Sequence, residues 1–228
     1  MGLNKTNGNM YPWVTHTWNP LAGECKHNCS YCYMKRSFLG NLKKYEGEVR
    51  LFKKELETDL GFNNTIFVGS ATDIFGDWVS NSIIKNILSY CRKFPNKYLF
   101  QSKNPSRFEE FIKFFPENSI IATTLETNRS YNVSKAPLPT KRYHDFLSIK
   151  YSRKMVSIEP VIDFDLDEFI CPIGSSVIFS NPKSFIVTFK RFTVSFAPLD
   201  PKNLPLGISV SLYEVYIILL KFIVLFQI

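Results

Sequence analysis

The sequence has little that marks an exported protein. Residues 1–10 are polar and contain no apolar core segment, so we expect no signal peptide. The 228 residues include five cysteines, and three of them lie close together. An odd, clustered set of this kind argues against a disulfide framework. We therefore expect a cytoplasmic protein, because reducing surroundings keep thiolates free to bind a metal.

The sequence also lacks a continuous basic segment. Lys and Arg outnumber Asp and Glu by 28 to 20, which gives a net charge of +8, yet these residues are scattered along the chain. The charge permits attraction to the phosphates of nucleic acid, a nucleotide or an anionic membrane, and does not choose among them. A merely solvated basic surface is the alternative. Hydrophobic residues at 45% and charged residues at 21% exclude wholesale disorder.

A group of three cysteines is the strongest chemical signal. Cys25, Cys29 and Cys32 are separated by three and then two residues. Three such thiolates can turn a short loop around one face of an iron–sulfur cube, each sulfur binding a different iron. The remaining iron is then open to a substrate or cofactor. A zinc site with His27 or His16 as fourth ligand, or a fortuitous cluster, are the alternatives, although zinc sites usually pair two such cysteine groups.

The spacing of the cysteines, with Tyr31 just before the last of them, resembles the signature of the radical S-adenosylmethionine (radical SAM) superfamily. Further segments resemble a phage-associated radical-SAM-like family of unassigned function, over about residues 11 to 170. These segments are residues 18–20, 67–70, 73–76, 124–129 and 157–160. The resemblance implies a [4Fe–4S] cluster held by Cys25, Cys29 and Cys32, with S-adenosylmethionine chelated by the open iron. It also implies reductive cleavage of that cofactor to a 5′-deoxyadenosyl radical, and an electron donor such as a flavodoxin or ferredoxin.

The resemblance also assigns cofactor contacts. It places Tyr31 near the adenine, and the turn at Gly69 and Ser70 near the methionyl amino group. Glu126 would accept hydrogen bonds from the ribose hydroxyls, and Arg129 would pair with the cofactor's carboxylate. A plain strand-to-loop turn at residues 69–70, core packing of Tyr31, and a surface ion pair for Glu126 and Arg129 are the alternatives.

Other polar residues follow predicted strands. Asp73 could bind an ammonium group or cap its turn. Glu159 closes an apolar strand, where a carboxylate normally has a partner, and the partner may be a ligand. Lys103 and Asn104 are candidates for substrate contacts or exposed loop residues. Cys91 falls on the apolar face of a predicted helix and is expected in the core.

Strands and helices are predicted to alternate about five times. The expected strands are residues 11–18, 65–70, 98–101, 119–125 and 155–158, and the expected helices are residues 30–38, 49–60, 80–94, 106–115, 139–149 and 165–170. This pattern is typical of right-handed βαβ units in a parallel sheet. We predict an α/β fold, a partial (β/α) barrel of about five to six units, in a domain spanning residues 1–172.

The alternation of strands and helices does not continue in residues 173–228. Their sequence predicts an atypical β-rich or irregular segment, and a frameshifted or misassigned chain end is an alternative. Residues 208–228 are mostly apolar, but Glu214 and Lys221 lie among them, so we do not expect a membrane span.

The sequence therefore predicts a radical SAM enzyme that starts radical chemistry on an unidentified substrate, with nucleic acid or a nucleotide as the candidate class. A non-catalytic zinc or iron–sulfur module that binds nucleic acid is the second hypothesis, and it requires four metal ligands. An inactive remnant with an open barrel is the third.

Overall fold

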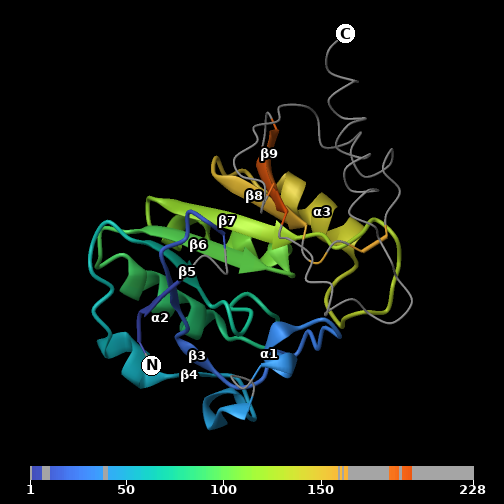
Figure 1. Cartoon of the computed structure of the whole chain (residues 1–228). Helices are drawn as coiled ribbons and strands as arrows, with labels where there is room; N and C mark the ends of the chain where they lie inside the picture. Colours follow the sequence, from blue (N-terminus) through green and yellow to red (C-terminus); the bar gives the residue numbers. More distant parts are fainter. Residues whose placement is uncertain are drawn as a thin grey trace.

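Eight strands of the computed structural model form one sheet, in the order β1-β2-β5-β6-β7-β8-β10-β9 (Figure 1). The structure describes residues 2–6, 11–37, 41–158, 160, 162–163, 185–189 and 192–196. The strands are β1 (Asn4–Lys5), β2 (His16–Trp18), β5 (Thr65–Val68), β6 (Lys97–Ser102), β7 (Ser119–Thr124), β8 (Lys154–Ile158), β9 (Phe185–Phe189) and β10 (Phe192–Phe196).

Most neighbouring strands in this sheet are parallel. The pairs from β2 through β5, β6, β7 and β8 to β10 run in parallel, and β1 and β9 pair antiparallel at the two edges. The mixed α/β class and the parallel sheet are thus confirmed. Closure into a barrel remains a prediction, since β1 and β9 end the sheet within the described residues.

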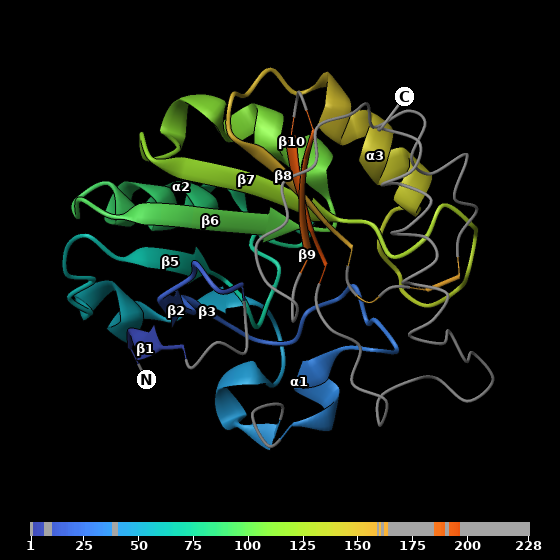
Figure 2. The ribbon, with the colours of Figure 1, turned by 45° about the horizontal axis from the view of Figure 1, so that its top comes forward.

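Helical segments cover one side of the sheet. Helices α2 (Asn81–Cys91) and α3 (Pro139–Ser148) lie on the same side (Figure 2), and the 3₁₀ helix η4 (Pro105–Phe114) contacts both. Ser80 caps α2, because its Oγ accepts a hydrogen bond from the backbone N–H of Ile83 at 3.4 Å. The apolar face of α2 is buried against the sheet, and Cys91 lies in this core as predicted.

The central strands are buried on both faces. Ile66 and Val68 of β5 belong to the large apolar cluster that includes the face of α2. Phe67, between them, points to the opposite face and packs with Leu99 and Met155 in a second cluster. Burial on both faces is what a parallel strand requires, and it explains why these strands read as short continuous apolar runs.

The prediction of a helix over residues 49–60 is wrong. Its range contains a short strand, β4 (Arg50–Leu51), and a 3₁₀ helix, η3 (Lys53–Glu57). Strand β4 pairs antiparallel with β3 (Leu21–Ala22), so its backbone hydrogen bonds go to another segment rather than along a helix. The apolar residues in this range have helical spacing, but pairing with β3 overrides that local preference. The predicted helix over residues 30–38 is also shorter than expected, because α1 spans only Tyr33–Arg36.

A buried ion pair holds this irregular segment. The Nζ of Lys44 lies 2.9 Å from Oε1 of Glu55, and each side chain is 3% exposed. Lys44 also donates to the backbone oxygen of Asn19 at 2.6 Å. Because both charges are out of water, removing one leaves the other without compensation.

We therefore expect Lys44→Met to lower the free energy of unfolding by about 3 to 5 kcal/mol, measured by urea denaturation of the metal-free protein. Adding Glu55→Leu should restore most of the loss, since an apolar pair can replace a buried ion pair. The matched control is Lys26→Met at the exposed pair with Glu48, where we expect about 0 to 1 kcal/mol. Equal effects of the two lysine substitutions would contradict the prediction.

The structure describes two strands beyond residue 172. Strand β10 pairs in parallel with β8, and β9 pairs with β10, so the sheet extends past the predicted domain boundary. The division at residue 172 stays a prediction. The helix predicted over residues 165–170 and the apolar residues 208–228 lie outside the described residues. Among the helices that are described, none has the length and apolar character needed to cross a membrane.

Candidate metal and cofactor site

The three cysteines lie on one loop, residues 23–32, which we call the cysteine loop. It joins β3 to α1 and is fixed at its start by Gly23, whose N–H donates to the oxygen of Lys44 at 2.8 Å. Gly23 has φ +96°, and a Cβ there would lie 2.4 Å from the backbone oxygen of Glu48, so only glycine fits. At the other side, the backbone N–H of Ser30 donates to Val133 at 2.8 Å. The loop is thus held between two distant segments of the chain.

The cysteine thiols are free and largely shielded. Cys29 is buried, and Cys25 and Cys32 are half-buried. Burial raises the pKa of Cys25 to about 12, and the negative charge of Asp73 raises it further. The backbone N–H groups of Asp73 and His27 act in the opposite direction and lower this pKa. Burial also raises the pKa of Cys29, against the nearby charge of Lys103. A bound metal cation would reverse this balance, because it stabilises thiolates directly.

Among the described residues, no three His, Cys, Asp or Glu side chains converge to hold one metal ion. In an iron–sulfur cube each thiolate binds its own iron, so a cluster at these three thiols stays a prediction. Of the two histidines considered as a zinc ligand, His16 lies on β2 beside Thr15, and His27 binds Asp73 through Nε2.

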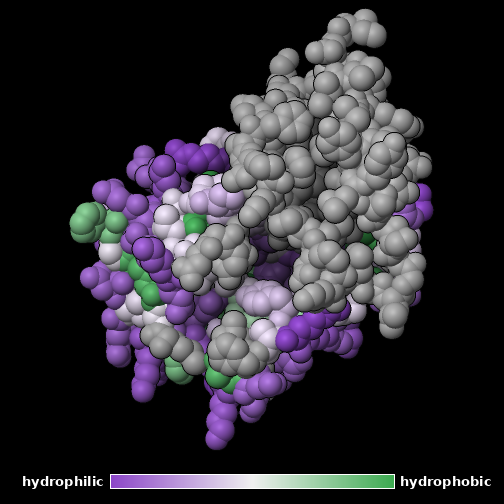
Figure 3. All heavy atoms as spheres, viewed as in Figure 1, coloured by the Kyte–Doolittle hydropathy of each residue, from purple (hydrophilic) through white to green (hydrophobic). Residues whose placement is uncertain are grey.

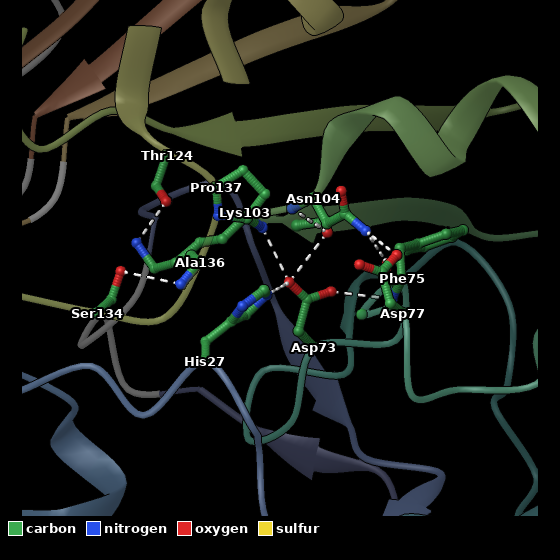
Figure 4. A network of polar contacts seen from close by, with 12 residues as sticks. His27, Asp73, Phe75, Asp77, Lys103, Asn104, Thr124, Ser134, Ala136 and Pro137 are labelled. Atoms are coloured by element: carbon green, nitrogen blue, oxygen red, sulfur yellow. Dashed lines mark hydrogen bonds and ion pairs between the residues drawn. The ribbon is translucent and has the colours of Figure 1, made fainter. Parts of the chain in front are cut away.

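Asp73 anchors the loop to the strand ends. Its Oδ2 lies 2.8 Å from Nε2 of His27 and also accepts from the Ser102 hydroxyl and the Lys103 backbone N–H, at 2.9 and 2.8 Å (Figure 4). Its Oδ1 accepts from the backbone N–H of Phe75 at 2.9 Å. Burial opposes ionisation, but the hydrogen bond with His27 and its charge hold the pKa of Asp73 below its ordinary value. Asp73 therefore caps its own turn, as one alternative proposed, and also binds the cysteine loop.

Glu126 forms a second anchor. It follows β7, is fully buried, and accepts hydrogen bonds from the Tyr31 hydroxyl, from Lys103 and from Arg142. Burial opposes its ionisation, but the charges of Lys103 and Arg142 hold the pKa of Glu126 at about 2. The pKa of Tyr31 is raised by burial and by the charge of Glu126, so its hydroxyl stays protonated and donates. Glu126 is thus a buried centre of charge and not part of a surface pair.

Lys103 connects the two anchors. Its backbone N–H binds Asp73, while its Nζ binds Glu126, donates to Thr124 Oγ1 at 2.6 Å and lies 5.1 Å from the centre of the Tyr31 ring. Tyr31 lies between Cys29 and Cys32, so this lysine reaches the part of the cysteine loop that joins the last two cysteines. In the space-filling view, hydrophilic side chains cover much of the described part of the face shown (Figure 3).

The turn after β5 lies beside the cysteine loop. Gly69 has φ +77°, and a Cβ there would lie 2.5 Å from the Ile74 side chain, so the turn requires glycine. The backbone oxygen of Ser70 accepts from the Tyr33 hydroxyl at 3.0 Å. Asn19 supports the turn, since its Oδ1 accepts from the Ser70 hydroxyl at 3.2 Å. Gly69 and Ser70 therefore lie next to α1, the helix that begins directly after Cys32.

One predicted cofactor residue, Arg129, is not part of this cluster. Arg129 binds the carboxylate of Asp163, with side chains that are 48% and 46% exposed, which matches the surface-pair alternative. Tyr131 donates to the same carboxylate at 3.1 Å. Glu159 lies outside the described residues. Asn104, a candidate substrate contact, is buried and donates to Asp77 at 2.7 Å.

Sequence reasoning missed Arg142. It is 1% exposed on α3, and its guanidinium also donates to the backbone oxygens of Thr124 and Pro137. The only local signal is its place four residues before Phe146, on the buried face of the helix. The binding role of His27 toward Asp73 was missed as well, because 46 residues separate the two.

Comparison with solved structures agrees with the class of fold. A spore photoproduct lyase mutant has a TM-score of 0.53 at 11% sequence identity, over 96% of this chain and 76% of the lyase chain. Spore photoproduct lyase complexed with a dinucleoside spore photoproduct has a TM-score of 0.46 at 14% identity, and there this chain spans about half, 48%, of the lyase's length. At 11% identity this likeness is one of fold alone.

The chain belongs to the family described as protein of unknown function (DUF5131), which matches residues 9–171. This range contains the cysteine loop and both of its anchors. None of the curated proteins compared with the chain matches it.

Proposed function

We propose that the chain is a radical SAM enzyme in which Cys25, Cys29 and Cys32 hold a [4Fe–4S] cluster and the open iron binds S-adenosylmethionine. One observation carries the proposal: three free thiols share a short loop that packs against the residues following β5, β6 and β7. Parallel α/β architectures bind ligands at that edge. When bound, the cluster would supply the electron that cleaves S-adenosylmethionine and starts radical chemistry.

The residues around the loop would orient the cofactor and exclude water. We assign Tyr31 to the adenine, and the backbone of Gly69 and Ser70 to the methionyl amino group. Asp73 and Glu126 would serve the site by holding the loop, because their carboxylate oxygens already accept hydrogen bonds from protein donors. The ribose contact of Glu126 would use its remaining acceptor capacity.

Two other assignments extend the proposal. Arg129 would bind the carboxylate of S-adenosylmethionine in exchange for Asp163, and Glu159 would complete the same rim. The substrate class that we propose is nucleic acid or a nucleotide, supported by the net charge of +8. Reduction of the cluster calls for an electron donor such as a flavodoxin or ferredoxin, and a cytoplasmic setting suits both.

Anaerobic reconstitution with iron and sulfide tests the proposal. We expect the reduced protein to give the electron paramagnetic resonance signal of a cubane cluster, and the signal to change when S-adenosylmethionine is added, because the cofactor binds the open iron directly. A protein that retains zinc instead, or whose cluster ignores the cofactor, would favour a non-catalytic metal module that binds nucleic acid.

A further inference from the structure

His27 lies in the middle of the cysteine loop and is buried in spite of its polar ring. It is 3% exposed, and its ring meets that of Trp78 edge-on, with centroids 4.7 Å apart. Its Nε2 lies 2.8 Å from Oδ2 of Asp73. A buried polar ring normally needs such a partner, so the contact accounts for the position of the side chain.

The partner carboxylate is itself fixed. Both oxygens of Asp73 accept hydrogen bonds, from the Ser102 hydroxyl and from the backbone N–H groups of Phe75 and Lys103, at 2.8 to 2.9 Å (Figure 4). Two of these donors belong to the end of one strand, since Ser102 is the last residue of β6 and Lys103 directly follows it. An ionised Asp73 therefore requires a donor at Nε2 of His27 and sets the orientation of the ring.

The pair also lies between two of the predicted ligand thiols. His27 comes two residues after Cys25 and two residues before Cys29, so its contact with Asp73 holds the loop between them. The backbone oxygen of His27 accepts from Lys135 at 2.7 Å on the other side of the loop. Nδ1 of His27 has no hydrogen-bond partner among the described residues. The contact of Nε2 with Asp73 is therefore the side-chain hydrogen bond that holds the ring in place.

We propose that His27, acting through Asp73, is a positioning residue that fixes the cysteine loop on the sheet edge and sets the place of Cys25 and Cys29. The placement of the loop stands on the contacts above. The consequence for a bound cluster rests on the proposed function.

The first test needs no metal. The rate at which iodoacetamide alkylates each cysteine is followed by mass spectrometry in the metal-free protein, for the wild type, His27→Leu and His27→Gln. We expect Cys25 and Cys29 to react about tenfold faster in His27→Leu, because the loop loses a charge-assisted hydrogen bond. His27→Gln should stay near the wild type, since its amide can donate to Asp73.

Two controls separate a local effect from unfolding. Cys91, fully buried in α2, reports global structure and should remain protected in every variant. His144→Leu replaces an exposed histidine on α3 and should change no rate. Unchanged alkylation of Cys25 and Cys29 in His27→Leu would overturn the proposal. A rise that Cys91 shares would do the same, because the role would then be general stability.

The second test uses the reconstituted protein. Release of iron to a chelator should be about 10- to 100-fold faster in His27→Leu than in the wild type, and His27→Gln should recover most of the difference. If the wild type itself holds no cluster, the proposed function fails and the alkylation result still decides the positioning role. If the wild type holds a cluster and His27→Leu releases it equally slowly, the positioning role alone fails.

Discussion

Cys29→Ala is expected to abolish retention of iron and sulfide after anaerobic reconstitution, from about four irons per chain to less than about one. Cys29 is the buried, central member of the three cysteines. A cubane that is left with two thiolates has two uncapped irons and is open to loss of metal. Iron and sulfide analysis after desalting measures the result, and circular dichroism should show that the helices remain.

The matched control is Cys91→Ala. This thiol is also buried and also replaced by a methyl group, but it lies in the core beside α2 and away from the cysteine loop. It should retain the full complement of iron. If Cys29→Ala retains as much iron and sulfide as the wild type, the cluster assignment is wrong, and the proposed radical mechanism fails with it.

Glu126→Gln is expected to lower the free energy of unfolding of the metal-free protein by about 3 to 5 kcal/mol. The carboxylate is the shared counter-charge of Lys103 and Arg142, whose side chains are 15% and 2% exposed. An amide cannot neutralise either cation, and its NH₂ group would face a donor. Urea denaturation followed by circular dichroism measures the loss.

The control for this substitution is Asp163→Asn, which removes a carboxylate from the exposed pair with Arg129. Water solvates both of these side chains, so we expect about 0 to 1 kcal/mol. If Glu126→Gln has an effect as small as Asp163→Asn, the buried charges must find other partners and Glu126 is not the centre of the anchor.

The effect of Glu126 should also depend on pH. Neighbouring cations hold its pKa at about 2 in the folded protein, against the ordinary value of 4.5. A lowered pKa means that the stabilisation is fully present above about pH 4.5 and is lost as the pH falls from there through about 2. The difference in stability between the wild type and Glu126→Gln should therefore shrink below pH 4.5.

Local patterns predicted the parts of the fold that depend on local chemistry. The helix over residues 80–94 was visible because Ser80 caps it and its apolar residues share one face. The strands at residues 65–70 and 119–125 were visible because they are short apolar runs, buried on both faces. The prediction for residues 49–60 also relied on a local pattern and was wrong. The apolar residues have helical spacing, but this segment pairs with β3 instead.

The candidate site divides in the same way. The prediction that Cys25, Cys29 and Cys32 bind a metal rests on their spacing, which a single loop can satisfy. The prediction that Tyr31 packs near the adenine likewise rests on its position beside them, and its contact with Glu126 was not predicted. By contrast, the partners of Glu126 lie 23 and 16 positions away, on the end of β6 and on α3.

By itself, then, the sequence determined an alternating α/β chain with a loop of three cysteines near its start. Only the tertiary structure decided that Asp73, Lys103 and Glu126 hold that loop. The physical reason is that spacing along the chain reports local geometry, whereas ion pairs at the ends of parallel strands depend on how separate strands align. Arg142 illustrates the limit, because a charged residue on the buried face of a helix reveals that it needs a partner but not which one.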